Sequence, residues 1–459
     1  MSMKLQYNLE NIGNIDKASI TIKPLTIIAG ENSKGKTFAT KSLYTILNSV
    51  YQNHILNELT KTFYMLNSSF EDIKNELSQP ALVDLDFQNR YELFTKRIKF
   101  FLEELVTYNI TEQYEFIQKN KKIFYTLDEL SKVYFNKRKK IRKFLKFVDE
   151  IEQFLFHMQQ LISIVEDIDK TIIDNINMSL ETGFKKNYQI TQLKSLINRN
   201  QEKPLKLDIK GIGNIEINQK SIIDFSFQQK GIQEVQNVSN IIFFDSPVYI
   251  KIRKALERKN FLDDFMSNGD SKYLKGYPEY IEQLYRYVDK EYIDIPDFNL
   301  ISQEIQEKIL GKLDVSKNGD ITYSDNQGNR IPLSLTAMGI SNVGLIDLLL
   351  RNNIINNGSF LIMDEPEVHL HPEWQVFLAE ILYKISKAGA NIIIATHSLD
   401  FLKAFENILK EENEIAEDII AINKMPYEES FSEKTELEKV GIVLDDLSRP
   451  FYNLYMQDI

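Results

Sequence analysis

Residues 30–37 read Gly-Glu-Asn-Ser-Lys-Gly-Lys-Thr. This segment fits the whole phosphate-loop pattern, which ends in glycine, lysine and a hydroxyl residue. Its glycines let backbone N–H groups turn towards phosphate oxygens, at the start of a helix whose dipole favours anions. The apolar run 25–29 precedes the loop and a helical pattern over 38–51 follows it. The sequence therefore predicts an α/β fold that binds ATP.

We expect this loop to supply most of the contacts to the nucleotide. Lys36 would reach the β- and γ-phosphates, and the Thr37 hydroxyl would bind Mg²⁺. The other predicted nucleotide contacts in this region are Gly30, Asn32, Ser33, Lys34, Gly35 and Phe38. A chance glycine-rich loop is the alternative, and the strand and helix patterns on its two sides argue against it.

A second apolar run, residues 359–363, ends in Asp364 and Glu365. We expect Asp364 to bind Mg²⁺ and Glu365 to polarise an attacking water. An apolar strand that ends in two acids is common by itself. Its pairing with an upstream phosphate loop is what makes the assignment specific.

A third apolar run, residues 391–396, ends at His397. A neutral histidine there could donate to the γ-phosphate or to the water, although a histidine at a strand end is more often structural. We expect the catalytic role because this run follows the other two motifs in order. His369 and His371 are not expected to form a metal pair, because Pro372 starts a helix and no further ligands lie nearby.

The composition limits the possible classes of protein. The chain has 459 residues, 43% of them hydrophobic, and carries a net charge of −11, which argues against a surface that is basic all over. It lacks an apolar run long enough to span a membrane, and its first residues do not resemble a secretory signal. The absence of cysteine excludes disulfides and thiolate metal sites. We expect a cytoplasmic protein without a membrane segment.

The order of the patterns predicts four regions. They are an N-terminal ATPase lobe at 1–51, a helical insertion at 52–200, a C-terminal ATPase lobe at 201–405 and a short tail at 406–459. Within the insertion, apolar residues follow a heptad spacing from Phe144 to Ile172. Neighbouring apolar residues widen this seam, which favours a packed helical subdomain over a long coiled coil.

The three motifs together carry a family resemblance. GENSKGKT at 30–37, FLIMDEPEVHLHPEWQ at 360–375 and IIIATHS at 392–398 resemble the ABC-type ATPase heads of the SMC and double-strand-break repair group. They are most similar in style to compact bacterial ATPases that include the OLD nucleases. The resemblance covers about residues 1–50 and 235–405. It implies a P-loop head with a mixed β-sheet core, split by a helical insertion, that uses ATP and Mg²⁺.

The resemblance also implies a signature segment that contacts the ATP of a second chain. Here this segment, residues 334–341, keeps Gly339 but has Ala337 and Met338 where a hydroxyl and a small residue are expected. Thr336 or Ser341 could supply the hydroxyl. We therefore expect Gly339 and Ser341 to contact nucleotide in a homo-oligomer with shared sites, and hydrolysis that is slow or triggered by a partner. The family's glutamine loop could lie at Gln228 or Gln229.

The partners follow from the same resemblance. Residues 405–459 hold too few acids for the Toprim nuclease domain of OLD proteins, so we expect no nuclease in this chain. The chain resembles the ATPase subunits of the anti-phage systems PARIS (AriA) and Septu (PtuA). This implies a separate effector, a nuclease, released by a phage protein or by nucleic acid.

Two alternatives remain. A chromosome or repair ATPase could bind DNA through the basic run 137–143, although a solvated face or an acidic partner would also explain that run. An ATPase subunit of a transporter is the other alternative, and the motif style and the large insertion argue against it.

Overall fold

The computed structural model describes residues 4–75, 85–140, 147–199, 203–253, 256, 276–290, 298–316 and 319–456. They belong to two compact units, one made of residues 1–51 and 180–459 and the other of residues 52–179. The helix α7 (Ile168–Asn187) crosses the boundary. The helical unit is therefore shorter than the expected insertion of 52–200, since residues 180–200 belong to the larger unit.

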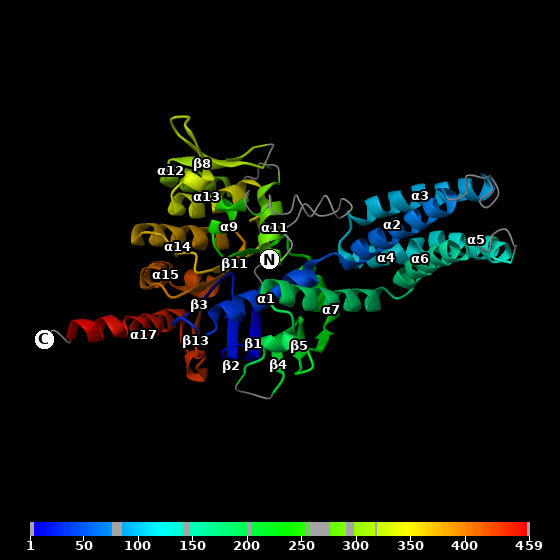
Figure 1. Cartoon of the computed structure of the whole chain (residues 1–459). Coiled ribbons are helices and arrows are strands. Elements are labelled where there is room, and N and C mark those ends of the chain that lie inside the picture. Colours follow the sequence, from blue (N-terminus) through cyan, green and yellow to red (C-terminus); the bar gives the residue numbers. More distant parts are fainter. Residues whose placement is uncertain are drawn as a thin grey trace. The chain divides into compact units, whose positions relative to one another are not determined.

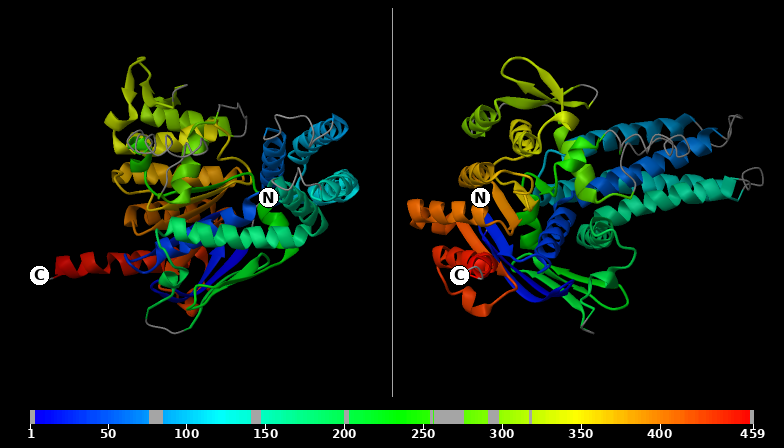
Figure 2. Two further views of the ribbon diagram at one scale, coloured as in Figure 1. Left: turned by 45° about the vertical axis from the view of Figure 1, so that its right-hand side comes forward. Right: turned by 60° about the vertical axis from the view of Figure 1, so that its left-hand side comes forward.

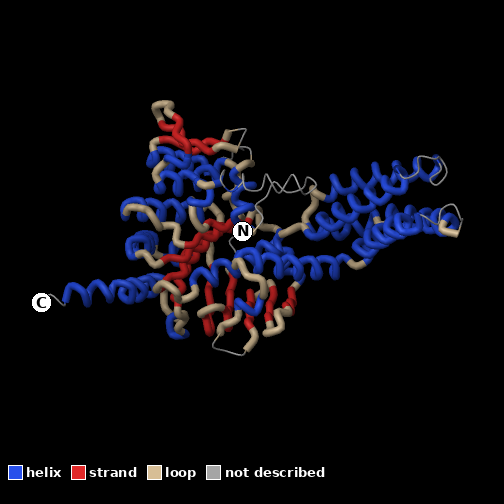
Figure 3. Tube along the Cα trace, in the orientation of Figure 1, coloured by secondary structure: helices blue, strands red, loops and turns tan. Residues whose placement is uncertain are grey.

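A parallel five-stranded sheet forms the centre of the larger unit (Figure 3). Its strands are, in spatial order, β13 (Ile420–Met425), β3 (Leu25–Gly30), β12 (Asn391–Thr396), β11 (Phe360–Asp364) and β7 (Ile241–Phe244). They are almost wholly buried, as expected for short apolar runs covered on both faces by helices. All the carboxyl ends meet at one edge, where ligands bind in open parallel sheets.

The helix α1 (Lys36–Tyr51) follows the phosphate loop and is buried along most of its length. It packs against the parallel sheet, and its Ser42 hydroxyl also lies 2.7 Å from the Tyr7 hydroxyl of β1 (Leu5–Ile12) in a second sheet (Figure 1). Polar side chains inside α1 bond to the helix backbone, as Thr45 does with the carbonyl of Lys41 at 2.7 Å. The two sheets together therefore fix the position of this helix.

The second sheet is antiparallel, in the order β2-β1-β4-β5-β6. Its remaining strands are β2 (Ile15–Ile22), β4 (Leu205–Ile209), β5 (Gly213–Ile217) and β6 (Ile223–Phe227). The turn between β1 and β2 reaches the phosphate loop, because Asn14 Nδ2 donates to the Ser33 carbonyl at 3.3 Å.

The rest of the larger unit is a small antiparallel sheet and a set of helices. The sheet has the order β10 (Arg330–Pro332), β9 (Ile321–Asp325) and β8 (Gly311–Val315). The helices are α8 (Gln229–Gln236), α9 (Val248–Lys251), α11 (Glu279–Val288), α12 (Asn299–Ile309), α13 (Met338–Arg351), α14 (Pro372–Lys387), α15 (Leu399–Glu412), α16 (Glu414–Ile419) and α17 (Glu436–Met456). Within the described part of the chain, no helix has both the length and the hydrophobicity needed to cross a membrane.

The smaller unit is helical, and its helices run side by side (Figure 2). They are α2 (His54–Asn75), α3 (Leu85–Leu105), α4 (Ile110–Asn120), α5 (Lys122–Arg138), α6 (Val148–Glu166) and the first part of α7. Stacked rings fill its core, with the Phe70 and Tyr91 centroids 3.8 Å apart. The heptad seam is buried from Phe147 to Ile172, but it does not lie on one continuous helix, because Asp167 interrupts the helix between α6 and α7. Phe144 lies outside the described residues.

The region 406–459 is expected to be a short tail, but its described residues, 406–456, are part of the fold. The strand β13 pairs in parallel with β3, which carries the phosphate loop. Glu436 of α17 accepts the Ile422 N–H at 2.7 Å, and its other oxygen lies 3.1 Å from both Lys23 and Lys439. The pairing of β13 depends on a strand far away in sequence, so no local pattern could indicate it.

This contact predicts a large stability effect. Glu436→Ala should lower the free energy of unfolding by about 3–5 kcal/mol, because it leaves two lysines and a backbone N–H without their shared acceptor. Glu433→Ala, at an exposed position on the same segment, should change the free energy of unfolding by less than about 0.5 kcal/mol. Chemical denaturation measures both, and equal losses would contradict the assignment.

Candidate active site

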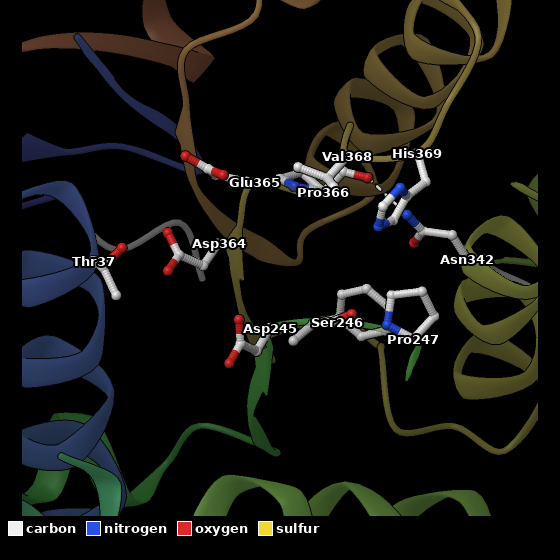
Figure 4. Close-up of a pocket in the computed structure, with 11 residues that line it drawn as sticks. Thr37, Asp245, Ser246, Pro247, Asn342, Asp364, Glu365, Pro366, Val368 and His369 are labelled. Atoms are coloured by element: carbon white, nitrogen blue, oxygen red, sulfur yellow. Dashed lines mark hydrogen bonds between the residues drawn. The ribbon is translucent and has the colours of Figure 1, made fainter. Parts of the chain in front are cut away.

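Three parallel strands end around one pocket, and a fourth, β12, ends beside it. β3 leads into the phosphate loop, and β12, β11 and β7 end next to His397, Asp364 and Asp245. The pocket has a volume of about 240 Å³ (Figure 4). It is lined by Thr37, Phe244, Asp245, Ser246, Pro247, Asn342, Asp364, Glu365, Pro366, Val368 and His369.

The conformation of the phosphate loop requires its two glycines. Gly30 has φ of 152°, and a Cβ there would stand 2.0 Å from the carbonyl oxygen of Met425 in β13. Gly35 has φ of 95°, and a Cβ would stand 2.4 Å from a side-chain carbon of Ile15. Between them Asn32, Ser33 and Lys34 are exposed. The loop is thus enclosed by the β13 backbone at Gly30 and by the Ile15 side chain at Gly35, and it is open in its middle.

Lys36 lies inside this loop. Its Nζ donates to the carbonyl oxygens of Gly30 and Glu31, both at 2.9 Å. Burial lowers the pKa of Lys36, and the neighbouring carboxylates of Glu365 and Asp364 oppose that shift. The ammonium group is therefore already held at the place where the loop would receive phosphates.

Thr37, in the first turn of α1, and Asp364 face each other in the pocket (Figure 4). Asp364 is only 8% exposed, and burial raises the pKa of its carboxyl group from 3.8 to about 6, against the effect of a hydrogen bond with the Thr37 side chain. The nearby Asp245 raises this pKa further. Among the described residues, Asp364 Oδ1 has no hydrogen-bond partner. A buried carboxylate oxygen of this kind fits a cation ligand.

The donor set suits Mg²⁺ held together with phosphates. No group of three or more histidine, cysteine, aspartate or glutamate residues that could hold a metal occurs in the part of the chain that the structure describes. Mg²⁺ in phosphate sites needs only one or two carboxylates, since water and phosphate oxygens complete its octahedron. Thr37 and Asp364 would supply the protein ligands.

Glu365 and His397 form the next pair. Glu365 Oε1 lies 3.0 Å from His397 Nδ1, and both side chains are about one-third exposed. Glu365 has φ of 48°, an uncommon value for a residue other than glycine, and its N–H donates to the Ala395 carbonyl at 2.8 Å. Such strain is typical of functional sites. A carboxylate next to a histidine can act as a general base.

Two acidic residues near these side chains were not predicted. Glu367 is buried, accepts the Thr396 hydroxyl and lies 3.4 Å from the N–H of His397, so it joins the loop after β11 to the end of β12. Burial raises the pKa of Glu367. Asp245 follows the apolar run of β7 as Asp364 follows that of β11, and this parallel was the signal available in the sequence.

The signature segment differs from the expectation. Ser341 is buried and its hydroxyl donates to the Ala337 carbonyl at 2.9 Å, while the Thr336 hydroxyl donates to the Pro332 carbonyl at 3.1 Å. Both hydroxyls are thus used within the chain. Gly339 lies half-exposed in the first turn of α13, whose N-terminus no side chain caps. Neither Gly339 nor Ser341 lines the pocket.

The expected glutamine loop also differs. Gln228 precedes α8, which begins at Gln229, and in the described part of the chain Gln228 does not line the pocket. The acidic residue that lines the pocket from this part of the chain is Asp245, directly after β7. Phe38, the last predicted contact, stacks on Tyr188 with the ring centroids 5.5 Å apart. The structure thus brings Thr37, Asp364 and Glu365 together at the pocket, with His397 next to Glu365. Gly339 and Ser341 of the signature segment do not line it, although the next residue of α13, Asn342, does.

Comparison with known proteins gives the family. A family model described as an AAA ATPase domain matches residues 3–402. The chain therefore belongs to this family of ATPases. Its phosphate loop at the end of a strand of a parallel sheet is that of a P-loop ATPase, with a helical unit inserted after α1.

Three known proteins share a more limited similarity with this chain. The DNA double-strand break repair Rad50 ATPase of Saccharolobus solfataricus is 26% identical over 123 residues, which cover 26% of this chain and 14% of that protein. The protein of the same name from Sulfurisphaera tokodaii is 31% identical over 98 residues, 21% of this chain and 11% of that protein. The SMC head domain from Thermotoga maritima has a TM-score of 0.34 at 10% identity, with 88% of this chain and 92% of that chain covered. The sequence matches span only a small part of the two Rad50 relatives.

The raised pKa of Asp364 makes a prediction about pH. Without Mg²⁺ and nucleotide, Asp364→Asn should raise the free energy of unfolding at about pH 8 by up to about 3 kcal/mol, because the native state of the wild type must then hold an ionised buried carboxylate. The gain should fall as the pH drops through about 6 and vanish below about 4, where the carboxyl group is protonated in both states. Thermal unfolding across this range measures it, and a difference independent of pH would contradict this explanation.

Proposed function

We propose that this member of the AAA ATPase domain family binds ATP with Mg²⁺ in the pocket between Thr37, Asp364 and Glu365, and hydrolyses it. The observation that carries the proposal is the buried Asp364 Oδ1, which has no hydrogen-bond partner among the described residues and lies next to a complete phosphate loop. A bound Mg²⁺ would neutralise phosphate charge there.

The side chains of the pocket divide the chemistry between them. The loop N–H groups and Lys36 bind the phosphates and orient the γ-phosphate. Glu365 accepts the proton of the attacking water, and His397 at 3.0 Å holds the Glu365 carboxylate in place and can donate to the γ-phosphate. Glu367 holds the end of β12, and thereby His397, through the Thr396 hydroxyl and the His397 N–H.

This division of roles predicts separate effects on binding and on hydrolysis. Glu365→Gln should keep the affinity for ATP within about threefold and lower the rate of hydrolysis by about 100-fold or more, because an amide cannot accept the proton. Glu380→Gln, at an exposed position on α14, should change neither. Equilibrium nucleotide binding and phosphate release measure the two effects. If Glu365→Gln hydrolyses ATP at the wild-type rate, Glu365 is not the general base.

We further propose that the site is completed by a second copy of the chain. The resemblance to SMC-type heads supports this, as does the position of Gly339 outside the pocket, in a helix N-terminus that no side chain caps. The N–H groups in the first turn of a helix favour an anion such as the γ-phosphate of a partner's ATP. Because Ser341 and Thr336 use their hydroxyls within the chain, fewer donors would reach that phosphate, and hydrolysis would be slow or depend on a partner.

Shared sites predict complementation between two inactive variants. Lys36→Ala removes the loop cation, and Gly339→Asp places a negative charge in the first turn of α13. A mixture should hydrolyse ATP at least about tenfold faster than either variant alone, because mixed dimers hold one intact site. If the mixture stays as inactive as its components, each chain builds its site alone.

As the biological role, we propose that this cytoplasmic ATPase holds and releases a separate effector, a nuclease, in defence against phage. The support is the resemblance of the DEPE-containing segment 360–375 to ATPase subunits of such systems. Purification together with the products of neighbouring genes tests it: a co-eluting nuclease is expected, and elution of the ATPase without one would contradict the role.

A repair or chromosome ATPase that acts directly on DNA is the second candidate. The similarity to Rad50 ATPases of DNA double-strand break repair favours it, as do Lys137 and Lys140, which are exposed in the basic run. In the same run, Lys139 pairs with Glu152 at 3.0 Å, and residues 141–143 lie outside the described part. Hydrolysis that DNA stimulates and that neutralisation of the run abolishes would favour this candidate.

A further inference from the structure

The carboxylate of Asp245 lies at the same level of the sheet as that of Asp364. β7 and β11 pair in parallel with Phe244 opposite Met363, so the residues that follow, Asp245 and Asp364, leave neighbouring strands side by side. Adjacent strands are about 4.8 Å apart. Both residues line the pocket with Thr37, and Figure 4 shows the two carboxylates on the same side as its hydroxyl.

This pairing of like charges needs compensation. Neighbouring like charges on a sheet are destabilising. One oxygen of Asp245 accepts the Tyr280 hydroxyl at 3.0 Å and lies 3.9 Å from Lys41 Nζ. These partners hold the side chain from the α1 and α11 side.

An independent observation points to a cation between the two acids. Asp364 is more than nine-tenths buried, and in the described part of the chain its Oδ1 has no hydrogen-bond partner. A buried carboxylate oxygen without a donor is costly, and a divalent cation would remove that cost. Mg²⁺ bound with phosphates takes one or two carboxylates, so the site has room for a second one.

We propose that Asp245 is the second carboxylate ligand of the metal, alongside Thr37 and Asp364, and that Tyr280 positions it. This inference rests on the proposed function, since it concerns the same pocket. The metal would then have a ligand at the end of β7. The Tyr280 hydroxyl, which bonds to Asp245, would link that ligand to α11. Two carboxylates also give the pocket a charge that favours divalent over monovalent cations.

The first test measures metal binding directly, with Mn²⁺ as the probe. Asp245→Asn in the full chain should weaken binding of Mn²⁺ with ADP by about 10–100-fold, as loss of a metal-site carboxylate does. Binding of ADP without metal should be unchanged or tighter, because a negative charge near the phosphates is lost. Tyr280→Phe should cause a smaller loss, and Asp224→Asn, an exposed residue of β6, none. Electron paramagnetic resonance of free Mn²⁺ follows the titration.

The outcomes separate this inference from the proposed function. If Asp364→Asn weakens Mn²⁺ binding but Asp245→Asn does not, Asp245 is not a ligand and the proposed function stands. If the wild type binds Mn²⁺ with ADP no better than Asp364→Asn does, both fail. Unfolding midpoints of the variants at the same pH show whether a loss of binding comes from a loss of folding.

A second test uses the absence of cysteine from this chain. Asp245→Cys introduces a single thiol, and a thiolate prefers Cd²⁺ to Mg²⁺. With ADP bound, this variant should bind Cd²⁺ and show the ultraviolet charge-transfer band of a Cd–thiolate bond, whereas Asp224→Cys should show it only at a much higher Cd²⁺ concentration. Equal Cd²⁺ titrations of the two variants would overturn the assignment.

Discussion

The buried carboxylate of Asp364 is the constraint on which the rest of the site depends. β11 carries it to the edge of the parallel sheet, where burial holds its pKa near 6 and one oxygen lacks a hydrogen-bond partner in the described structure. A fold that keeps such a group must recover its cost when a ligand binds. The strained backbone of Glu365 and the lowered pKa of Lys36 are found in the same region. Both cost folding free energy that a bound ligand would recover.

The surrounding architecture holds these groups in register. α1 is packed between two sheets, which keeps Lys36 and Thr37 at the end of β3. β12 lies between β3 and β11 and brings His397 next to Glu365. β13 lies on the other side of β3, and its Met425 carbonyl packs against Gly30. The pairing of the strands in the parallel sheet therefore sets the positions of these side chains at the candidate site.

The features that could be predicted from the sequence are local ones. The loop at 30–37 and the acids at 364 and 365 each follow an apolar strand within a few residues, so their chemistry and context can be seen together. Asp245 also follows an apolar run, but only the pairing of β7 with β11 places it beside Asp364. Glu367 and β13 were missed because a hydrogen bond and a strand pairing with distant segments decide their positions. The expected hydroxyl of Ser341 was assigned from its position in a motif, and helix geometry directs it to the carbonyl one turn earlier.

A structure of the Glu365→Gln variant with ATP and Mg²⁺ tests the central claim most directly. We expect phosphates within the loop 30–37, the metal bound by Thr37 and Asp364, and the α13 N-terminus of a second chain at the γ-phosphate. Phosphates outside the loop, or a metal bound away from Asp364, would contradict it.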